Sequence, residues 1–499
     1  MQSMFKFTKF LPDPTATDNL ARELAPYLAP GDVLALTGHL GAGKSHFARA
    51  LIVALGSQQK HLPSPTFTLI QTYDDTRMPI AHVDFYRLGD PSEADELSLE
   101  PFIEHGLSLI EWADNAPHVC PERTLRVNIE DKDSGRQITF TSEDESWEKR
   151  FGFFIPELQR PVTEKGRSQF VQDVTGKKGQ VISAVSADGS FRSYWRVRDG
   201  QKSSILMDAP PPMESVESFV SVAKILRDNN IHAPEVYHAD NKKGYALIED
   251  FGDTTFGKAV KDGADMLSLY EKAVDVLLHL SPASLPSSLP TQTYEGWQDY
   301  LCLFTDWYMP HANGHATHTS DRRHFREIVK NMYKTLMQAP SSVMMGDYHC
   351  DNVMLLSPQK DLQAQKEIPG SIDDVGVLDF QDALIGPNTF DLARFIYDIR
   401  IPQPEHIRSI LTERFMTPWL GTNKEEGIRQ SLRVASLFHM LRLLGVFHRL
   451  AYRDGKTNFL DYLPVTWQYF LPMLENWEEA EELAEFIFKR TPTAKEVAV

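Results

Sequence analysis

Two kinds of hydrophobic pattern alternate over the first 140 or so residues of this 499-residue chain. Short apolar runs, typical of buried strands, occur at "DVLALTG", "MPIAHVDFYRL" and "GLSLIEWAD", while "KSHFARALIVALG" has its apolar positions at helical spacing. Two further runs, "LRVNIED" and "RQITFTS", predict a closing hairpin. This order of strand, loop, helix and strand predicts an α/β domain with a largely parallel sheet over residues 1–150.

A different pattern follows the polar exit "SEDESWEKR" and a connector that we place at residues 151–167. Three short strands are predicted from residue 168 onward, then a helix at "SVESFVSVAKILRDNNI" and a hairpin at "EVYHADNKKGYALIEDFGD". The rest is mostly helical, ending in an amphipathic helix at "EEAEELAEFIFKR". A strand-rich small lobe (about 168–255) before a helical lobe (about 256–490) is the two-lobed α+β plan of protein-kinase-like domains.

Composition narrows the class of protein. With 42% hydrophobic and 24% charged residues, and no apolar run near the roughly 18–20 residues that span a bilayer, we expect a cytoplasmic protein without membrane contact. The three cysteines are far apart, which predicts reduced thiols. The net charge is −18, and the first 150 residues hold 14 Lys and Arg against 23 Asp and Glu. Neither part is a basic nucleic-acid binder, so we expect any tRNA contact to be indirect.

The segment "GHLGAGKS" carries the first candidate site. It matches G-x-x-x-x-G-K-[ST] and lies between a predicted strand and a predicted helix, the context that this phosphate-binding loop requires. The glycines let successive N–H groups turn toward a phosphate, the lysine side chain bridges phosphates, and the serine hydroxyl binds Mg²⁺. The predicted ATP-binding residues of this loop are Gly38, Gly41, Ala42, Gly43, Lys44 and Ser45.

Four more residues complete the first site. Thr66 in "SPTF" is a candidate second Mg²⁺ hydroxyl, and Asp84 at a strand end is placed to hold a metal-bound water. Glu111 ends an apolar strand and is predicted to orient the attacking water, with Trp112 beside it as a nucleotide contact. Alternatives remain open: Asp84 paired with Arg87, and Trp112 as a packing residue. His82 is expected to be structural.

The combination of "LGAGKS", "SPTF", "HVDFYRL" and "IEW", in this order over residues 5–145, resembles the TsaE family of small bacterial ATPases. The resemblance implies a weak ATPase that takes part in the threonylcarbamoyl modification of adenosine 37 in tRNA, with TsaB- and TsaD-like subunits as partners. His39 departs from the family, which commonly has an acidic residue there.

A second candidate site lies in "VMMGDYHCDNVMLL" and "GVLDFQDALIGPNTFDLARF". Phosphoryl transfer to a hydroxyl needs a carboxylate that receives or orients the hydroxyl proton, and oxygen ligands that hold Mg²⁺. Asp347 fits the first, catalytic, role, and Asn352 and Asp379 fit the second. Asp382 is a further candidate for the metal environment, while Asp391 on a predicted helix is expected to anchor the catalytic loop from below.

Over about residues 170–470, segments such as "SADGSFRSYWRV", "GDYHCDNVMLL" and "VLDFQDALIGPNTFDLARF" resemble the aminoglycoside phosphotransferase family, and within it AmgK-type sugar kinases. The resemblance implies ATP-dependent phosphorylation of an amino sugar of the N-acetylmuramate/N-acetylglucosamine type. Two positions depart from related kinases: Met207 stands on the third strand where many have a lysine, and Met345 where the loop often has a histidine. Arg192 or Arg196 is a candidate replacement for the lysine.

We therefore predict an α/β P-loop NTPase domain followed by a two-lobed α+β protein-kinase-like (aminoglycoside phosphotransferase) domain, with ATP and Mg²⁺ in both. Two alternatives remain for the second domain: a nucleotide-binding regulatory module, or a kinase for another small hydroxyl compound such as an aminoglycoside. We expect acceptor choice to lie around residues 290–320 and 430–460.

Overall fold

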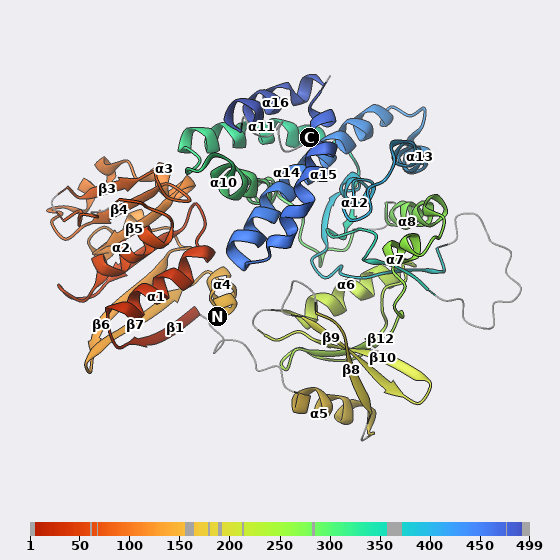
Figure 1. The fold of residues 1–499 in the computed structure, drawn as a ribbon, viewed down its shortest axis with the longest axis horizontal. Helices are drawn as coiled ribbons and strands as arrows, with labels where there is room; N and C mark the ends of the chain where they lie inside the picture. Colours follow the sequence, from red (N-terminus) through yellow and green to blue (C-terminus); the bar gives the residue numbers. More distant parts are fainter. Residues whose placement is uncertain are drawn as a thin grey trace, which may run out of the picture.

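The computed structural model describes residues 5–59, 62–66, 68–154, 164–177, 180–187, 192–211, 214–281, 285–356, 372–475 and 477–491. In Figure 1 the α/β unit lies on the left, the helical lobe at the upper right and the strand-rich lobe below it. Phe67 of "SPTF", most of the turn "ADGS" and residues 155–163 of the predicted connector lie outside the described residues.

The first unit is built on one seven-stranded sheet in the order β1-β7-β6-β2-β5-β4-β3. Its strands are β1 Phe5–Leu11, β2 Val33–Thr37, β3 Ile70–Tyr73, β4 Ile80–Asp84, β5 Leu107–Glu111, β6 Leu125–Lys132 and β7 Gly135–Ser142. Its α-helices are α1 Pro14–Leu24, α2 Lys44–Ala54, α3 Glu100–His105 and α4 Ser146–Phe154, joined by 3-10 turns at Ala25–Tyr27, Pro91–Leu97, Ala113–Asn115 and Pro117–Val119.

The sheet is mixed, which corrects the expectation of a largely parallel one. β2 pairs in parallel with β5 and β6, and β4 with β5, whereas β1–β7, β6–β7 and β3–β4 are antiparallel. The predicted β6–β7 hairpin is confirmed, but β1 was missed, although its exposure alternates along the strand. The central parallel strands bury both faces, because helices and loops cover the sheet on each side.

Helices occupy both ends of the predicted connector. The first unit ends with helix α4, whose Trp147 and Phe151 are buried in that unit's core. On the far side, α5 (Glu164–Thr175) packs Phe170 and Val171 against Leu206 of the next sheet. The second unit therefore begins with a helix that the sequence pattern did not indicate.

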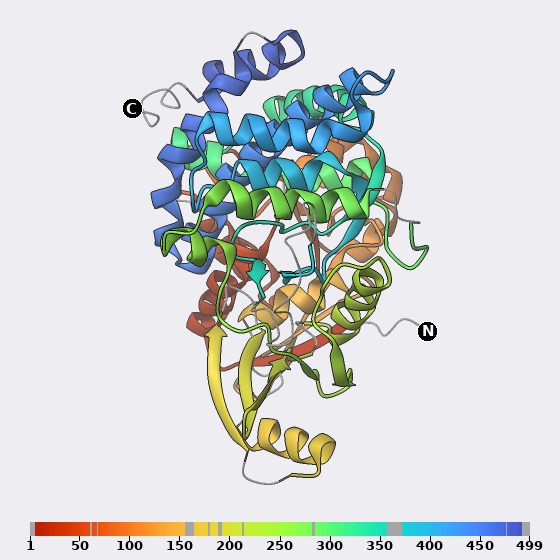
Figure 2. The same cartoon turned by 90° about the vertical axis from the view of Figure 1, so that its right-hand side faces the viewer.

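The strand-rich lobe is a five-stranded antiparallel sheet in the order β11-β12-β10-β9-β8. As predicted, three strands precede a helix and a hairpin. The elements are β8 Val181–Ala187, β9 Ser193–Asp199, β10 Lys202–Asp208, α6 Val216–Asp228, β11 Val236–Asp240 and β12 Tyr245–Glu249. Figure 2 shows this lobe below the stacked helices, with α5 at its far end.

The helical lobe surrounds two small β-pairs, β13–β16 and β14–β15, which carry the loops of the second site. The strands are β13 Ser341–Met344, β14 Val353–Leu355, β15 Val375–Val377 and β16 Leu384–Pro387. The helices are α7 Phe256–Lys261, α8 Met266–Leu280, α9 Tyr294–Leu303, α10 Met309–Asn313, α11 Thr319–Leu336, α12 Thr389–Ile396, α13 Glu405–Met416, α14 Glu425–Asp454, α15 Leu463–Leu474 and α16 Glu478–Arg490, with a π-helical turn at Phe304–Tyr308 and 3-10 turns at Thr417–Trp419 and Thr457–Tyr462.

Helix α14 is the central element of this lobe. It is long and apolar enough to cross a membrane, contrary to the expectation that the chain has no apolar run of that length. However, 83% of its most apolar stretch is buried inside the protein. It packs on α9, α11, α12 and α15. Its hydrophobicity is therefore accounted for by its place in a helical core.

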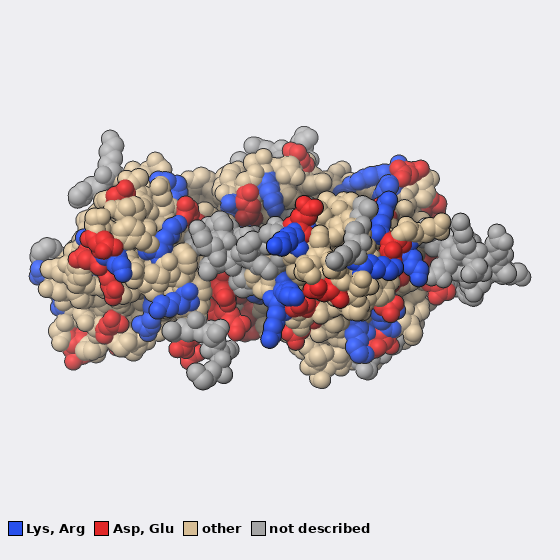
Figure 3. Space-filling view, turned by 90° about the horizontal axis from the view of Figure 1, so that it is seen from below, with Lys and Arg blue, Asp and Glu red and all other residues tan. Residues whose placement is uncertain are grey.

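The α/β unit contacts the helical lobe directly. The guanidinium of Arg77 lies 4.3 Å from the centre of the Trp307 ring, and Arg326 Nη1 lies 2.8 Å from Nδ1 of His105 at the end of α3. Figure 1 shows α3 beside α10 and α11. On the face seen in Figure 3, acidic and basic side chains are interspersed, without a broad basic area.

Candidate functional sites

The first site is built by the turn between β2 and α2. Gly38 has φ 134°, and a Cβ there would lie 2.2 Å from the carbonyl oxygen of Ile129. Gly43, which precedes α2, has φ 109°. These two backbone conformations are costly for any other residue, so the loop that turns N–H groups toward a phosphate depends on its glycines.

Lys44 is folded over this loop. Its Nζ donates hydrogen bonds to the carbonyls of Gly38 (2.8 Å) and His39 (3.0 Å), and it lies 4.0 Å from the centre of the Trp112 ring. Burial lowers the pKa of Lys44, while the nearby charges of Glu111 and Asp84 act in the opposite direction. The predicted lysine, tryptophan and carboxylates therefore lie together in one place.

Two hydroxyl–carboxylate pairs surround the lysine. Ser45 Oγ donates to Glu111 Oε2 at 2.8 Å, and Thr66 Oγ1 donates to Asp84 Oδ2 at 2.6 Å. Nε2 of the fully buried His82 lies 2.8 Å from Oε1, the other carboxylate oxygen of Glu111. Since β4 and β5 are parallel neighbours, their final residues Asp84 and Glu111 lie in register at the same sheet edge.

His39, the departure from the TsaE pattern, lies on the outer side of the loop. Its Nε2 contacts Asp131 at 3.0 Å, and Asp131 also pairs with Arg136 at 2.6 Å. Arg136 in turn donates to the carbonyl of Ala42 at 3.0 Å. The histidine thus belongs to a contact between the loop and the β6–β7 hairpin.

The second site is held by a carboxylate below its loop. Asp391 on α12 accepts hydrogen bonds from the backbone N–H groups of Met345 (2.6 Å) and Gly346 (3.0 Å). It is buried, and burial raises its pKa to about 6. The expected anchoring role of Asp391 agrees with this geometry, and because the bonds use the backbone, the side chain of Met345 is not needed for them.

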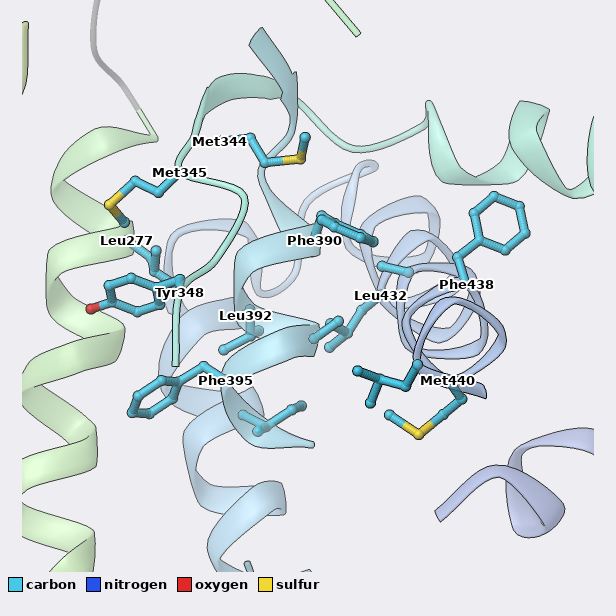
Figure 4. Packing of buried hydrophobic residues seen from close by; sticks show 14 of the residues in the cluster. Leu277, Met344, Met345, Tyr348, Phe390, Leu392, Phe395, Leu432, Phe438 and Met440 are labelled. Carbon is cyan, nitrogen blue, oxygen red and sulfur yellow. The ribbon is translucent and has the colours of Figure 1, made fainter. Parts of the chain in front are cut away.

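Hydrophobic packing fixes the same loop from the other side. Figure 4 shows Met345 and Tyr348 of the loop against Leu277 of α8, and Phe390 and Phe395 of α12 nearby. Tyr348 also donates to the backbone carbonyl of Ala273 at 2.8 Å. Asp347 therefore emerges from a loop that is fixed on both flanks.

Arg394 and His349 lie beside Asp347. Its carboxylate lies 3.3 Å from Arg394 Nη1 and 3.7 Å from His349 Nε2. Burial alone raises the pKa of the Asp347 carboxyl, but the hydrogen bond with His349 and the charge of Arg394 hold it well below its usual value. The group is therefore a carboxylate at neutral pH, able to accept a hydrogen bond from a hydroxyl group.

The two predicted metal ligands lie beside it. Asn352 Nδ2 donates to the backbone carbonyl of Asp347 at 2.9 Å and lies 3.4 Å from Asp379 Oδ2. Asp379 has φ 57°, a left-handed conformation that costs free energy and directs its carboxylate toward Asn352. An all-oxygen pair suits Mg²⁺, which takes its remaining ligands from water and phosphates. Asp382 is exposed, and the side-chain N–H₂ group of Gln381 donates hydrogen bonds to both Asp382 and Asp379.

Arg192 is a residue of this site whose role the sequence left open. Its Nη2 lies 3.2 Å from Asp379 Oδ1, and its Nε lies 3.6 Å from Glu214, just before α6. Arg196, by contrast, is bound by Asp250 and Asp253. Met207 is fully buried and faces the core. Of these three residues, Arg192 is therefore the one whose cationic group contacts Asp379.

One cavity of about 790 Å³ joins these residues between the two lobes. Its lining includes Arg192, Asp347, Asn352 and Asp379, together with residues from the end of α14 and the turn after it: Phe447, Asn458, Phe459 and Tyr462. These last four fall within or next to 430–460, one of the two ranges expected to determine the acceptor, whereas no residue of the other range, 290–320, lines this cavity. Among the described residues, no cluster of three or more His, Cys, Asp or Glu side chains forms a metal site.

Sequence reasoning did not identify His82 as the partner of Glu111, nor Arg394 beside Asp347. Both contacts join segments that are distant in sequence, so no local motif contains the pair. All three cysteines are free, in agreement with the prediction.

Known proteins resemble the two units separately. Residues 11–138 match the family model of the threonylcarbamoyl adenosine biosynthesis protein TsaE. The TsaE protein of Bacillus subtilis is 39% identical over 132 residues, which cover 26% of this chain and 82% of that protein. The TsaE protein of Rickettsia felis is 38% identical over 122 residues, which cover 24% of this chain and 71% of that protein.

Residues 181–419 match the phosphotransferase enzyme family. The N-acetylmuramate/N-acetylglucosamine kinase of Pseudomonas aeruginosa is 30% identical over 308 residues, which cover 60% of this chain and 86% of that protein. The two similarities follow one another along the chain, as the two sites do. The chain therefore belongs to two families, the TsaE family through its first unit and the phosphotransferase enzyme family through its second.

Proposed function

We propose that the chain is a bifunctional ATP-dependent protein of the cytoplasm. Residues 1–150 act as an ATPase that supports N6-threonylcarbamoyladenosine formation at position 37 of tRNA, with TsaB- and TsaD-like subunits as partners. Residues 168–490, together with α5, act as a kinase for an amino sugar of the N-acetylmuramate/N-acetylglucosamine type. The observation that carries this proposal is that each unit matches most of the length of its relatives and has its own set of phosphate-handling residues.

In the ATPase unit, the loop from Gly38 to Gly43 presents N–H groups to the nucleotide phosphates, and Lys44 moves from its carbonyl partners to the phosphate oxygens. Ser45 and Thr66 would hold Mg²⁺, which neutralises phosphate charge when bound. Glu111 and Asp84 already contact these hydroxyls and would bind or orient water around them. Trp112 would contact the nucleotide from beside the lysine.

In the kinase unit, the ionised Asp347 accepts a hydrogen bond from the acceptor hydroxyl and orients it toward the phosphate. Its low pKa makes it a weak base, so the proton moves to it late, when the oxygen has begun to bind phosphorus. Asn352 and Asp379 would hold Mg²⁺ on the phosphates. Arg192, in contact with Asp379, would stabilise the negative charge of the phosphates.

The test uses the full-length chain, labelled ATP and N-acetylmuramate, with Asp347→Asn and Lys44→Ala as matched variants. A sugar phosphate should form, should be lost in Asp347→Asn and should survive in Lys44→Ala. The reverse pattern is expected when threonylcarbamoyl transfer to tRNA is measured with TsaB- and TsaD-type subunits. If ATP binds to the second unit and no sugar is phosphorylated, the amino-sugar kinase proposal is wrong.

A further inference from the structure

A second, smaller cavity lies directly beside Asp347. Its volume is about 30 Å³, and it shares Asp347, His349, Ile399 and Arg400 with the large cavity between the lobes. Space of this size holds about two water-sized groups. Its remaining polar lining comes from Arg394, Asp398, His439 and Arg442.

Three arginines line this cavity, but its carboxylates already have partners. Asp398 accepts hydrogen bonds from the backbone N–H groups of Cys350 (3.1 Å) and Arg400 (3.0 Å) and lies 3.4 Å from the Arg400 guanidinium. Asp347 lies between His349 and Arg394. No carboxylate among the described residues therefore lies within ion-pair distance of Arg442.

Arg442 and its neighbours carry unused hydrogen-bond donors. The Nε atoms of Arg442 and Arg394 and Nδ1 of His439 are sealed from solvent and have no hydrogen-bond partner within the described part of the chain. Arg394 is 3% exposed and His439 6% exposed. Burial lowers the pKa of His439 well below its usual value, so this ring is neutral and adds no competing charge. Arg442 is partly buried and has no carboxylate partner, which is costly for a cation, and an anionic group bound there would reduce the cost.

These arginines lie on the acceptor side of the reaction. The acceptor hydroxyl must approach Asp347, and the small cavity opens from that same carboxylate. A substituent a few ångströms from the reacting hydroxyl can therefore reach Arg442 and Arg400. Two oxygens of a carboxylate match both the volume of the cavity and the paired donors of a guanidinium.

We propose that Arg442 and Arg400 bind the carboxylate of an anionic acceptor sugar. This inference rests on the proposed kinase function and narrows its substrate. N-acetylmuramate differs from N-acetylglucosamine by a lactyl ether on the sugar ring, and this group carries a carboxylate. Because only N-acetylmuramate can bind the two arginines in this way, the protein prefers N-acetylmuramate. A polycationic aminoglycoside is disfavoured in the same place, although the chain as a whole carries −18.

The test compares kcat/KM for N-acetylmuramate, its methyl ester and N-acetylglucosamine in the full-length protein. The wild type should prefer the free acid to the neutral ester. Arg442→Met keeps the apolar packing on Tyr300. It should lower kcat/KM for N-acetylmuramate relative to kcat/KM for N-acetylglucosamine at least ten-fold, chiefly by raising the KM for N-acetylmuramate. Arg442→Lys keeps the charge and should retain part of the preference.

Arg449→Met is the matched control, because Arg449 lies on the same helix and lines neither cavity. It should leave the ratio at the wild-type value. Arg400→Gln is a second variant on the solvent-facing side, and it decides the question if Arg442→Met does not fold. A ratio within two-fold of wild type in these variants overturns the inference. If that unchanged ratio comes with an equal loss of kcat/KM for both sugars, the arginines act on the phosphoryl group instead. A wild type that phosphorylates neither sugar overturns the proposed kinase function instead.

Discussion

At the scale of single residues, the second site shifts the pKa values of two neighbouring carboxyl groups in opposite directions. Asp391 is buried and has two backbone N–H partners, and burial raises its pKa to about 6. Asp347 has His349 and Arg394 beside it, which hold its pKa well below the usual value despite burial. Asp391, which anchors the loop, is thus a carboxyl group whose charge burial disfavours, while Asp347, the proposed catalytic group, is a carboxylate at neutral pH.

Buried neutral histidines make the helical lobe sensitive to acid. Burial lowers the pKa of His448 to about 4, while its Nδ1 lies 2.9 Å from the carbonyl oxygen of Leu444. An unfolded chain takes up the proton near pH 6.5, whereas the folded chain does not. The stability that depends on neutral His448 is therefore complete above pH 6.5 and falls toward pH 4, by up to about 1.4 kcal/mol per pH unit.

His448→Gln should therefore flatten the pH dependence of the free energy of unfolding between pH 6.5 and 4. Urea unfolding followed by tryptophan fluorescence measures it. His118→Gln changes an exposed histidine and serves as the control. A His448→Gln protein with the wild-type pH dependence would show that another group causes the acid sensitivity.

At the scale of elements, the long helix α14 packs so closely on α9 that one glycine has no room for a methyl group. A Cβ at Gly445 would lie 2.3 Å from the backbone carbon of Leu303. Alanine normally stabilises a helix by about 1 kcal/mol relative to glycine. Here we expect Gly445→Ala to destabilise the helical lobe by about 1–3 kcal/mol, because the backbones must separate.

Gly427→Ala in the same helix is the control. Its Cβ would meet only the Gln338 side chain, with the movable Oε1 nearest at 3.0 Å and Cβ at an ordinary 3.4 Å, so helix propensity should prevail and raise stability. Thermal unfolding of both variants measures the difference. Equal effects of the two substitutions would contradict the close packing of α14 on α9.

Elements with strong periodicity could be predicted from the sequence, whereas those defined by contacts could not. The P-loop strand and helix and the strands that end in Asp84 and Glu111 follow from local patterns. Strand β1 depends on pairing with β7, more than 120 residues later, and α5 has only a narrow apolar side. The motif residues of both sites were likewise visible. Arg442 was not, because the loop residues beside it, such as Asp347 and Asp398, are distant in sequence.

At the scale of the whole molecule, the ATPase unit meets the kinase through the edge of its sheet opposite the P-loop. Strands β2, β4 and β5 run in parallel, and Thr37, Asp84 and Glu111 end them at the nucleotide edge. The contacts with the helical lobe come from Arg77 and His105, which precede β4 and β5. The P-loop edge therefore points away from this contact, while the cavity of the second unit lies between its own lobes.

The pair formed by Arg77 and Trp307 is one of the contacts between the two units. Arg77 also donates to the carbonyls of Ala25 (3.1 Å) and Leu28 (2.6 Å), so its guanidinium is fixed in place. Trp307 is 6% exposed. A shielded cation–π contact contributes about 2 kcal/mol, so Trp307→Leu should lower the free energy of unfolding of the full-length chain by that order.

A double-mutant cycle with Arg77→Met separates this contact from general packing. If the two side chains stabilise the protein through each other, the double variant loses less than the two single variants together, by about 1–2 kcal/mol. Sugar phosphorylation should be unchanged in Arg77→Met, because the contact lies outside the kinase cavity. Fully additive losses would mean that each residue acts only within its own unit, and that this pair does not couple the two units.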